Sequence, residues 1–125
     1  MLTINAYFNF MGNTEEAMNF YKSVFGGEFT IFSRFKDLPG SENMAAHEKE
    51  KLMHISLTTE SGTIMMATDF LESMGQTFVP GNQVNLCIQA ESEEEVDKQS
   101  YNKDRLPPKS IHTSNNYITH LFNMT

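Results

Sequence analysis

The first 27 residues change abruptly from a hydrophobic period of two to a hydrophobic period of 3.6. Residues 2–10 (LTINAYFNF) alternate apolar and polar side chains, which is typical of a strand with one buried face. Asn13 then has the residue type of a helix N-cap, with Glu16 three positions later as its capping-box partner. An apolar stripe at helical spacing follows, and Gly26-Gly27 ends it. Its members are Ala17, Phe20, Tyr21, Val24 and Phe25. The segment therefore predicts a strand followed directly by an amphipathic helix.

Further strands are predicted after this helix, at residues 28–36, 52–59, 62–69 and 83–90. The second and third are joined by Glu60-Ser61, which favours a hairpin. Polar residues 37–50 predict a loop, and residues 70–82 predict a longer connection. A second capping box, Ser92-x-x-Glu95, predicts the start of another helix. The order of strand, helix and strands therefore begins to repeat.

This repeat stops near Lys98. The positions that would form the apolar stripe of the second helix carry polar side chains: Gln99, Ser100, Lys103 and Asp104. Pro107-Pro108 ends any helix there, and after it only residues 117–122 (YITHLF) have the pattern of a strand. No glycine occurs after Gly81. We expect residues 99–125 to pack poorly or to complete the sheet of a neighbouring subunit.

Charge and composition exclude several classes of protein. Sixteen acidic and nine basic residues give a net charge of -7, which argues against a general nucleic-acid binder. The single cysteine, Cys87, excludes an intramolecular disulfide and a zinc site built from four cysteines of one chain. No apolar run approaches the roughly 18 residues of a spanning helix, and residues 1–20 lack a basic region before an apolar one. We expect one cytoplasmic domain without nucleic-acid or membrane partners.

Three stretches resemble a known family: NFMGNTEEAMNFYKSVFGGEF, LMHISL and GTIMMATDFL. They are similar to the PhnB-like branch of the vicinal oxygen chelate superfamily, which includes glyoxalase I, bleomycin-resistance proteins and extradiol dioxygenases. The resemblance covers about residues 2–98. It implies an α+β fold of two βαβββ modules whose sheets curl around a concave ligand cavity, and it implies a homodimer.

On this resemblance, residues 1–125 form a single domain whose second module is incomplete or altered. Residues 1–70 are the first βαβββ module, residues 71–98 begin the second, and residues 99–125 are an anomalous tail. The family has an apolar helix and strands rich in glycine and aromatic residues in this region. Either a frameshift or true divergence accounts for the tail.

The resemblance also indicates where a metal would be bound in relatives. It places Asn5 at the ligand position of the first strand and Asn85 at the equivalent position of the fifth, while the fourth-strand position falls within the apolar residues 64–67. Amide oxygens are weak ligands for zinc, iron or nickel, so we expect no metal cofactor. Two interpretations stay open for the polar residues Asn5, Tyr7, Asn9 and Asn85. They line a metal-free cavity that orients a small ligand by hydrogen bonds, or they belong to a solvated sheet face.

Two further residues are candidates for ligand binding. His54 lies in a predicted strand and could serve as a general base or a hydrogen-bond donor, or it is a hydrogen-bonded histidine of the core or an interface. Arg34 could hold an anionic substrate through two parallel hydrogen bonds, or it pairs with one of the many carboxylates. No catalytic residue can be named, because the chain contains no P-loop, dinucleotide-binding or nucleophile-elbow motif.

The expected function is that of a PhnB-like, glyoxalase/bleomycin-resistance-like protein that binds a small polar or aromatic molecule in the concave face of the sheet. The first alternative is a metal-dependent lyase or dioxygenase, with a divalent metal held through a partner subunit or through His112 or His120 of the tail. The second is a non-catalytic dimeric scaffold. Many relatives carry the label 3-demethylubiquinone 3-methyltransferase, but the residues here show no site for S-adenosylmethionine.

Overall fold

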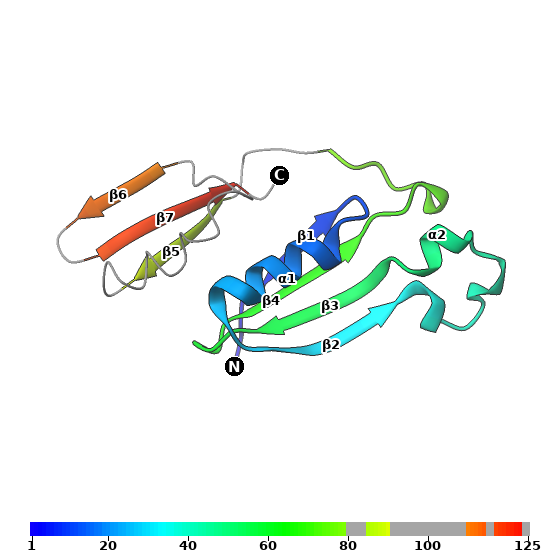
Figure 1. Ribbon diagram of the computed structural model, residues 1–125, viewed down its shortest axis with the longest axis horizontal. Helices are drawn as coiled ribbons and strands as arrows, with labels where there is room; N and C mark the ends of the chain where they lie inside the picture. The colour runs from blue at the N-terminus through cyan, green and yellow to red at the C-terminus, as the bar shows by residue number, and fades with distance from the viewer. Residues whose placement is uncertain (80–84, 91–109, 115–116, 124–125) are drawn as a thin grey trace. The chain divides into compact units, whose positions relative to one another are not determined.

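The structure is a computed structural model that describes residues 1–79, 85–90, 110–114 and 117–123 (Figure 1). The chain divides into two compact units, residues 1–78 and residues 79–125. The boundary lies within the predicted connection, residues 70–82. Helices and strands occur together in the first unit, so the fold class is α+β, as the sequence predicts.

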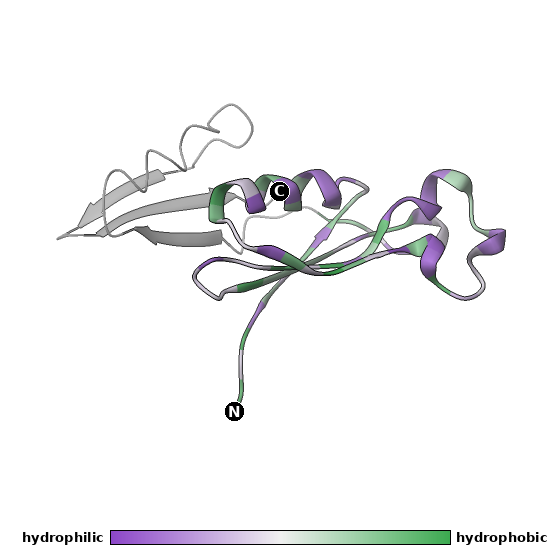
Figure 2. Cartoon of the chain, turned by 60° about the horizontal axis from the view of Figure 1, so that its bottom comes forward, coloured by the Kyte–Doolittle hydropathy of each residue, from purple (hydrophilic) through white to green (hydrophobic). Residues whose placement is uncertain are grey.

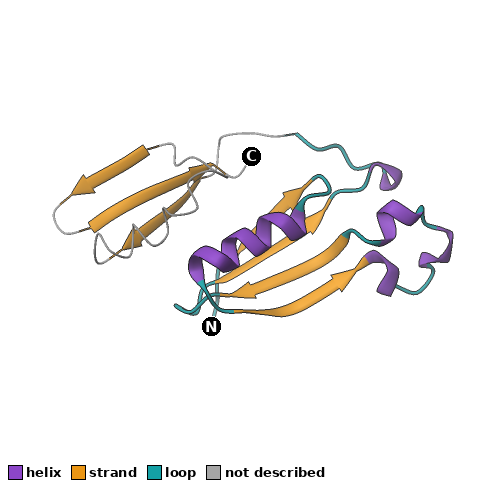
Figure 3. Ribbon diagram, in the orientation of Figure 1, coloured by secondary structure: helices purple, strands orange, loops and turns teal. Residues whose placement is uncertain are grey.

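The main elements of the first unit are the long helix α1 and a four-stranded mixed sheet (Figure 3). Its elements are β1 (Ala6–Phe10), α1 (Thr14–Phe25), β2 (Glu28–Arg34), β3 (Leu52–Thr58) and β4 (Ile64–Asp69). The strand order across the sheet is β1-β4-β3-β2, with β1 parallel to β4 and β3 antiparallel to both of its neighbours. The predicted hairpin of residues 52–59 and 62–69 is confirmed by the pairing of β3 with β4.

The core lies between α1 and one face of this sheet (Figure 2). Met18 and Tyr21 of α1 are buried there, together with Ile55 and Leu57 of β3 and Ala67 of β4. The buried stripe of the helix therefore has Met18 at its centre, whereas the sequence pattern placed Phe20 and Val24 in it; both of these are half-buried. The apolar stripe predicted the position of the helix correctly but not the side that is buried. The sheet determines which side of the helix faces inward.

The first strand is shorter than its alternating pattern. Pairing with β4 begins at Ala6 opposite Met65, so residues 2–5 continue past the paired part of the strand. Leu2 and Ile4 are 94% and 95% exposed, although the pattern predicted them on the buried face. Figure 2 shows this segment leaving the sheet on the side opposite α1.

Residues 28–36 (EFTIFSRFK) alternate less regularly than residues 2–10, and the pairing of β2 explains this. Register shifts interrupt the pairing of β2 with β3 between Phe29 and Ile31 and between Ser33 and Arg34. Such shifts change which face successive side chains occupy. The predicted loop at residues 37–50 contains two short helical segments, η2 (Ser41–Asn43) and α2 (Ala46–Lys49), preceded by η1 (Phe35–Asp37).

The second unit contains a three-stranded antiparallel sheet of order β5-β7-β6. Its strands are β5 (Asn85–Ala90), β6 (Ser110–Ser114) and β7 (Tyr117–Asn123). β5 and β7 correspond to predicted strands. β6 was not predicted, because SIHTS is mostly polar and carries little strand signal.

β6 and β7 of the tail form a sheet with β5 of the same chain. The expectation that the tail packs poorly or completes the sheet of a neighbouring subunit stays a prediction, because the side chains of these strands lie outside the described residues. This sheet does not repeat the first, because β5 and β7 run antiparallel where β1 and β4 run parallel. The predicted helix starting at Ser92 lies outside the described residues. In the part of the chain that the structure describes, no helix is long and apolar enough to cross a membrane.

Candidate functional site

The first sheet has one face that α1 does not cover (Figure 2). Alternation in β1 places Ala6, Phe8 and Phe10 toward α1, as the contact between the Phe8 and Tyr21 rings shows, so Tyr7 and Asn9 lie on the other face. Directly paired residues of neighbouring strands point to the same side, and the register therefore defines this surface. We call it the open face; by this register it carries Tyr7, Asn9, Glu28, Ile31, Ser33, His54, Ser56, Thr58, Ile64, Met66 and Thr68.

Tyr7 and His54 meet on the open face. The Tyr7 hydroxyl lies 3.4 Å from His54 Nδ1, and the two ring centroids are 5.7 Å apart. Because β4 lies between β1 and β3, the Tyr7 side chain must cross β4 to make this contact. The contact is longer than an ordinary hydrogen bond of a hydroxyl, and the tautomer of His54 decides which atom donates. Tyr7 is 48% exposed, so the pair is accessible to a ligand.

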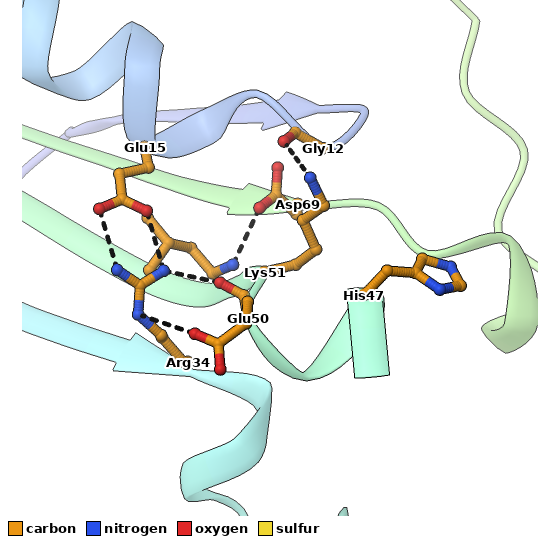
Figure 4. A pocket seen from close by; sticks show the side chains of 8 residues that line it. Gly12, Glu15, Arg34, His47, Glu50, Lys51 and Asp69 are labelled. Atoms are coloured by element: carbon orange, nitrogen blue, oxygen red, sulfur yellow. Dashed lines mark hydrogen bonds and ion pairs between the residues drawn. The ribbon is translucent and has the colours of Figure 1, made fainter. Parts of the chain in front are cut away.

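A second candidate site is an open cavity of about 310 Å³ near the start of α1 (Figure 4). It is lined by Gly12, Glu15, Arg34, His47, Glu50, Lys51, Leu52 and Asp69. We call it the charged cavity. The lining comes from β2, β3 and β4, from α1 and α2, and from the segments just before α1 and β3. Figure 4 shows Glu15, Arg34 and Glu50 pointing toward one another.

Arg34 is at the centre of the charged cavity and binds α1. Its guanidinium donates to both oxygens of Glu15 at 2.8 and 2.9 Å, and to the backbone carbonyl of Glu50 at 2.6 Å. The hydrogen bond from Arg34 lowers the pKa of Glu15 below its ordinary value, and the same bond raises the pKa of Arg34. Of the two interpretations of Arg34, the structure shows the pairing with a carboxylate of the protein.

The other charged groups of this cavity are also engaged by the protein itself. Lys51 Nζ donates to the Gly12 carbonyl at 2.8 Å. Asp69 is buried and accepts hydrogen bonds from the backbone and hydroxyl of Thr14 and from the backbone N–H of Leu52. Together with the Arg34–Glu15 pair, these interactions join α1 to β2, β3 and β4. The charged groups of the cavity therefore stabilise the packing of the helix on the sheet.

The residues predicted from the sequence therefore separate into three groups. Tyr7, Asn9 and His54 share the open face, and Arg34 lies on the α1 side of the sheet. Asn5 is exposed in the segment before β1. Asn85 is the first residue of β5 and pairs with Asn123 in the second unit. The structure describes the backbone of Asn85 but not its side chain.

The tail histidines occupy strands of the second sheet, with His112 opposite Thr119 and His120 opposite Ile111. Among the described residues, no three His, Cys, Asp or Glu side chains gather closely enough to hold a metal ion. Sequence reasoning did not assign Glu15 or Lys51 to any site. Their only signal was charge at the ends of predicted elements, which is common on any protein surface.

Comparisons with known proteins give the fold and no more. No family model matches the chain, and no curated protein matches it. Among solved structures, the crystal structure of protein PA1353 from Pseudomonas aeruginosa is similar, with a TM-score of 0.78. The match covers 99% of this chain and 91% of that chain, at 20% sequence identity.

Proposed function

We propose that this protein binds a small molecule on the open face of the first sheet, with Tyr7 and His54 orienting it. The observation that carries this proposal is the contact between these two side chains, which are 47 positions apart in the sequence. Two polar rings that converge on an accessible surface offer a ligand both hydrogen bonds and stacking. Within the described part of the chain, no hydrogen bond to His54 Nε2 occurs, so this atom is available to a ligand.

The topology of the first unit supports the proposal. Its element order, β1-α1-β2-β3-β4, is the βαβββ order of the vicinal oxygen chelate superfamily, which the sequence resembles. We propose that the unit is a module of this type. In that superfamily the ligand occupies the concave side of the sheet, which corresponds to the open face here.

The test is a screen of small polar and aromatic molecules by NMR, followed by titration of those that bind. We expect ligands to shift the resonances of Tyr7, His54 and Met66. Tyr7→Ala and His54→Ala should each weaken binding about tenfold, as expected when one orienting contact is lost. Asn19→Ala is the matched control, since Asn19 is exposed on α1. Ligand shifts confined to the charged cavity, or binding that neither open-face variant alters, would contradict the proposal.

The proposal includes no metal. Among the residues of the open face, His54 is the one imidazole and Glu28 the one carboxylate, and Glu28 lies beside Lys22 at the start of β2; the other polar groups are hydroxyls and the Asn9 amide. Elemental analysis of the purified protein tests this part: stoichiometric nickel, zinc or iron would favour the metal-dependent alternative, with ligands from a partner subunit or from His112 and His120.

A homodimer is also part of the proposal, because most relatives in the superfamily are dimers. Sedimentation equilibrium of the whole chain should give twice the mass of one chain. A monomer at all concentrations would contradict the dimer. Ligand binding by the single chain would still be tested by the NMR titration.

A further inference from the structure

We infer that residues 2–10, at one edge of the first sheet, pair antiparallel with the same residues of a second copy of this chain. We call this segment the β1 edge. The inference rests on the homodimer of the proposed function and identifies its interface. It follows from an unprotected strand edge, from apolar side chains that nothing covers, and from the absence of charge.

The two edges of the first sheet differ. β2 forms one edge; its pairing with β3 has two register shifts, and its ends carry Glu28 and Arg34. Bulges and charged side chains are common means by which edge strands avoid pairing with another chain. β1 forms the other edge, with a continuous register and with neither proline nor a charged residue within residues 1–13. Among the described strands, none pairs with its outer side.

The outward backbone groups of β1 follow from one hydrogen bond. The Phe10 carbonyl accepts from the first N–H after β4 at 2.7 Å, so the backbone of Phe10 faces β4. Backbone direction alternates along a strand, so the N–H and C=O groups of Tyr7 and Asn9 face outward. A second strand therefore finds a row of donors and acceptors at this edge.

Residues 2–5 form an arm that continues the alternation of β1. Leu2 and Ile4 belong to the same apolar set as Phe8 and Phe10, yet they are 94% and 95% exposed. Within the described residues, no hydrogen bond holds this arm, so it can align with a second strand. Antiparallel pairing of two complete β1 edges places Leu2 opposite the partner's Phe10 and Ile4 opposite the partner's Phe8. Each arm is then covered by the other copy.

The side of α1 nearest the β1 edge is apolar as well. Glu15 and Lys22 point to the opposite edge, where each contacts a side chain of β2. Ala17 and Val24 follow them by two positions, which is about 200° around a helix. Both are half-buried. A second copy at the β1 edge therefore meets apolar side chains in the sheet and in the helix layer.

Charge and area fit a second copy. The chain has a net charge of -7, so like charges oppose contact elsewhere, but the β1 edge is uncharged. The edge is about 30 Å long, and a helix packed on a sheet is about 20 Å deep. The resulting area of about 600 Å² on each copy lies at the lower end of the range for specific complexes, about 600–1,000 Å² per partner.

Full overlap of the two β1 edges fixes the register and completes the open face. Ala6 then lies beside the partner's Ala6 on a twofold axis, and Tyr7 pairs with the partner's Asn5. Directly paired side chains lie on the same side of a sheet. The partner's Asn5 therefore joins Tyr7 on the open face, so each binding surface receives a residue from the other copy.

A cysteine at the axis tests this register. Two residues at position 6 form a pair without mutual backbone hydrogen bonds, with Cα atoms about 4.5 Å apart, which a disulfide can span. Ala6→Cys should therefore form a disulfide-linked dimer in oxidised glutathione in most chains, with the link between the two substituted positions shown by peptide mapping. Asn19→Cys, exposed on α1, is the control and should link in less than about a tenth of chains in the same time.

A second pair of variants tests the apolar contact by sedimentation equilibrium. Ile4→Asp should raise the dimer Kd at least about tenfold, because its carboxylate would be buried against the partner's Phe8 without a counter-charge. Met74→Asp is the control, since Met74 is 60% exposed outside the β1 edge, and it should leave the Kd unchanged. Both positions are exposed in the single chain, so both variants should keep the fold, which circular dichroism checks.

The outcomes separate this interface from the rest of the proposed function. A dimer in which Ala6→Cys links no better than Asn19→Cys, or in which Ile4→Asp dissociates no more than Met74→Asp, would overturn the β1 edge and leave the homodimer intact. A monomer at all concentrations would refute both the interface and the homodimer. Ligand binding at the open face is decided separately, by the NMR titration of the Tyr7 and His54 variants.

Discussion

The carboxylate of Asp69 accepts hydrogen bonds from both the backbone N–H and the hydroxyl of Thr14, at 3.1 and 2.7 Å. Asp69 is the last residue of β4 and Thr14 is the first residue of α1, and both are almost fully buried. The sequence predicted that Asn13 would cap the helix with its side chain, but Asn13 makes no such hydrogen bond. A residue 55 positions away in the sequence therefore provides the cap.

The first prediction concerns this cap. Asp69→Asn should lower the free energy of unfolding by about 2–3 kcal/mol, because an amide has one acceptor oxygen and leaves a buried donor of Thr14 or Leu52 unpaired. Asn13→Ala is the control, with an expected loss under about 0.5 kcal/mol because its side chain makes no cap. Urea unfolding of the two variants measures both values. A larger loss for Asn13→Ala would contradict this account of the helix start.

The second prediction concerns the glycine turn after α1. Gly27 and Gly62 have nearly the same positive φ, +90° and +88°, so alanine is disfavoured at both by about 1 kcal/mol. A Cβ at Gly27 would also overlap the Thr58 carbonyl, whereas a Cβ at Gly62 would meet nothing within 4 Å. Gly27→Ala should therefore cost about 3 kcal/mol or more, because the β3 backbone must move. Equal losses for the two variants in thermal unfolding would show that Gly27 is not packed against β3.

The third prediction concerns acid stability. Arg34 lowers the pKa of Glu15 in the folded chain, so the ion pair stabilises the protein above the ordinary carboxyl pKa of 4.5 and loses this effect as pH falls through the lowered value. The side chain of Glu15 is 45% exposed, so the contribution should stay below about 1 kcal/mol. Glu15→Gln should be less stable than the unchanged protein at neutral pH and should approach it in acid. Glu16→Gln, at the exposed neighbouring position, is the control, and an identical pH profile for both variants would refute the role of Arg34.

The fourth prediction concerns alkaline stability. Burial raises the pKa of Tyr21 to about 12, from an ordinary value of 10.0. The folded chain therefore keeps this proton in a range where the unfolded chain loses it, so stability should fall as pH rises from about 10 to about 12. Urea unfolding across this range measures the slope. Tyr21→Phe should flatten the slope, and an unchanged slope would show that Tyr21 does not cause the loss.

Local patterns predicted α1 and the four strands of the first unit. The periods of residues 2–10 and 13–25 predicted β1 and α1, and Gly26-Gly27 predicted where the helix ends. The short polar turn between residues 52–59 and 62–69 predicted the β3–β4 hairpin. These signals work because hydrogen bonds within a helix or a tight hairpin join residues that are close in the sequence.

Local patterns were not sufficient where a distant strand decides the outcome. The rotation of α1, which buries Met18, depends on the sheet beneath it, and the first strand starts at Ala6 because Met65 of β4 is the first partner in its register. β6 has a mostly polar sequence and forms by pairing with β7. Strand propensity depends strongly on such context.

The sequence by itself determined the order and approximate bounds of the first helix and strands, and it identified Tyr7, Asn9 and His54 as polar residues of predicted strands. Only the tertiary structure decided that Tyr7 meets His54 across β4, that Arg34 binds Glu15 on the other side of the sheet, and that Asp69 caps α1. The physical reason is that periodicity shows which face of an element is apolar. Strand order and register, which arise from contacts between distant residues, determine which polar side chains meet.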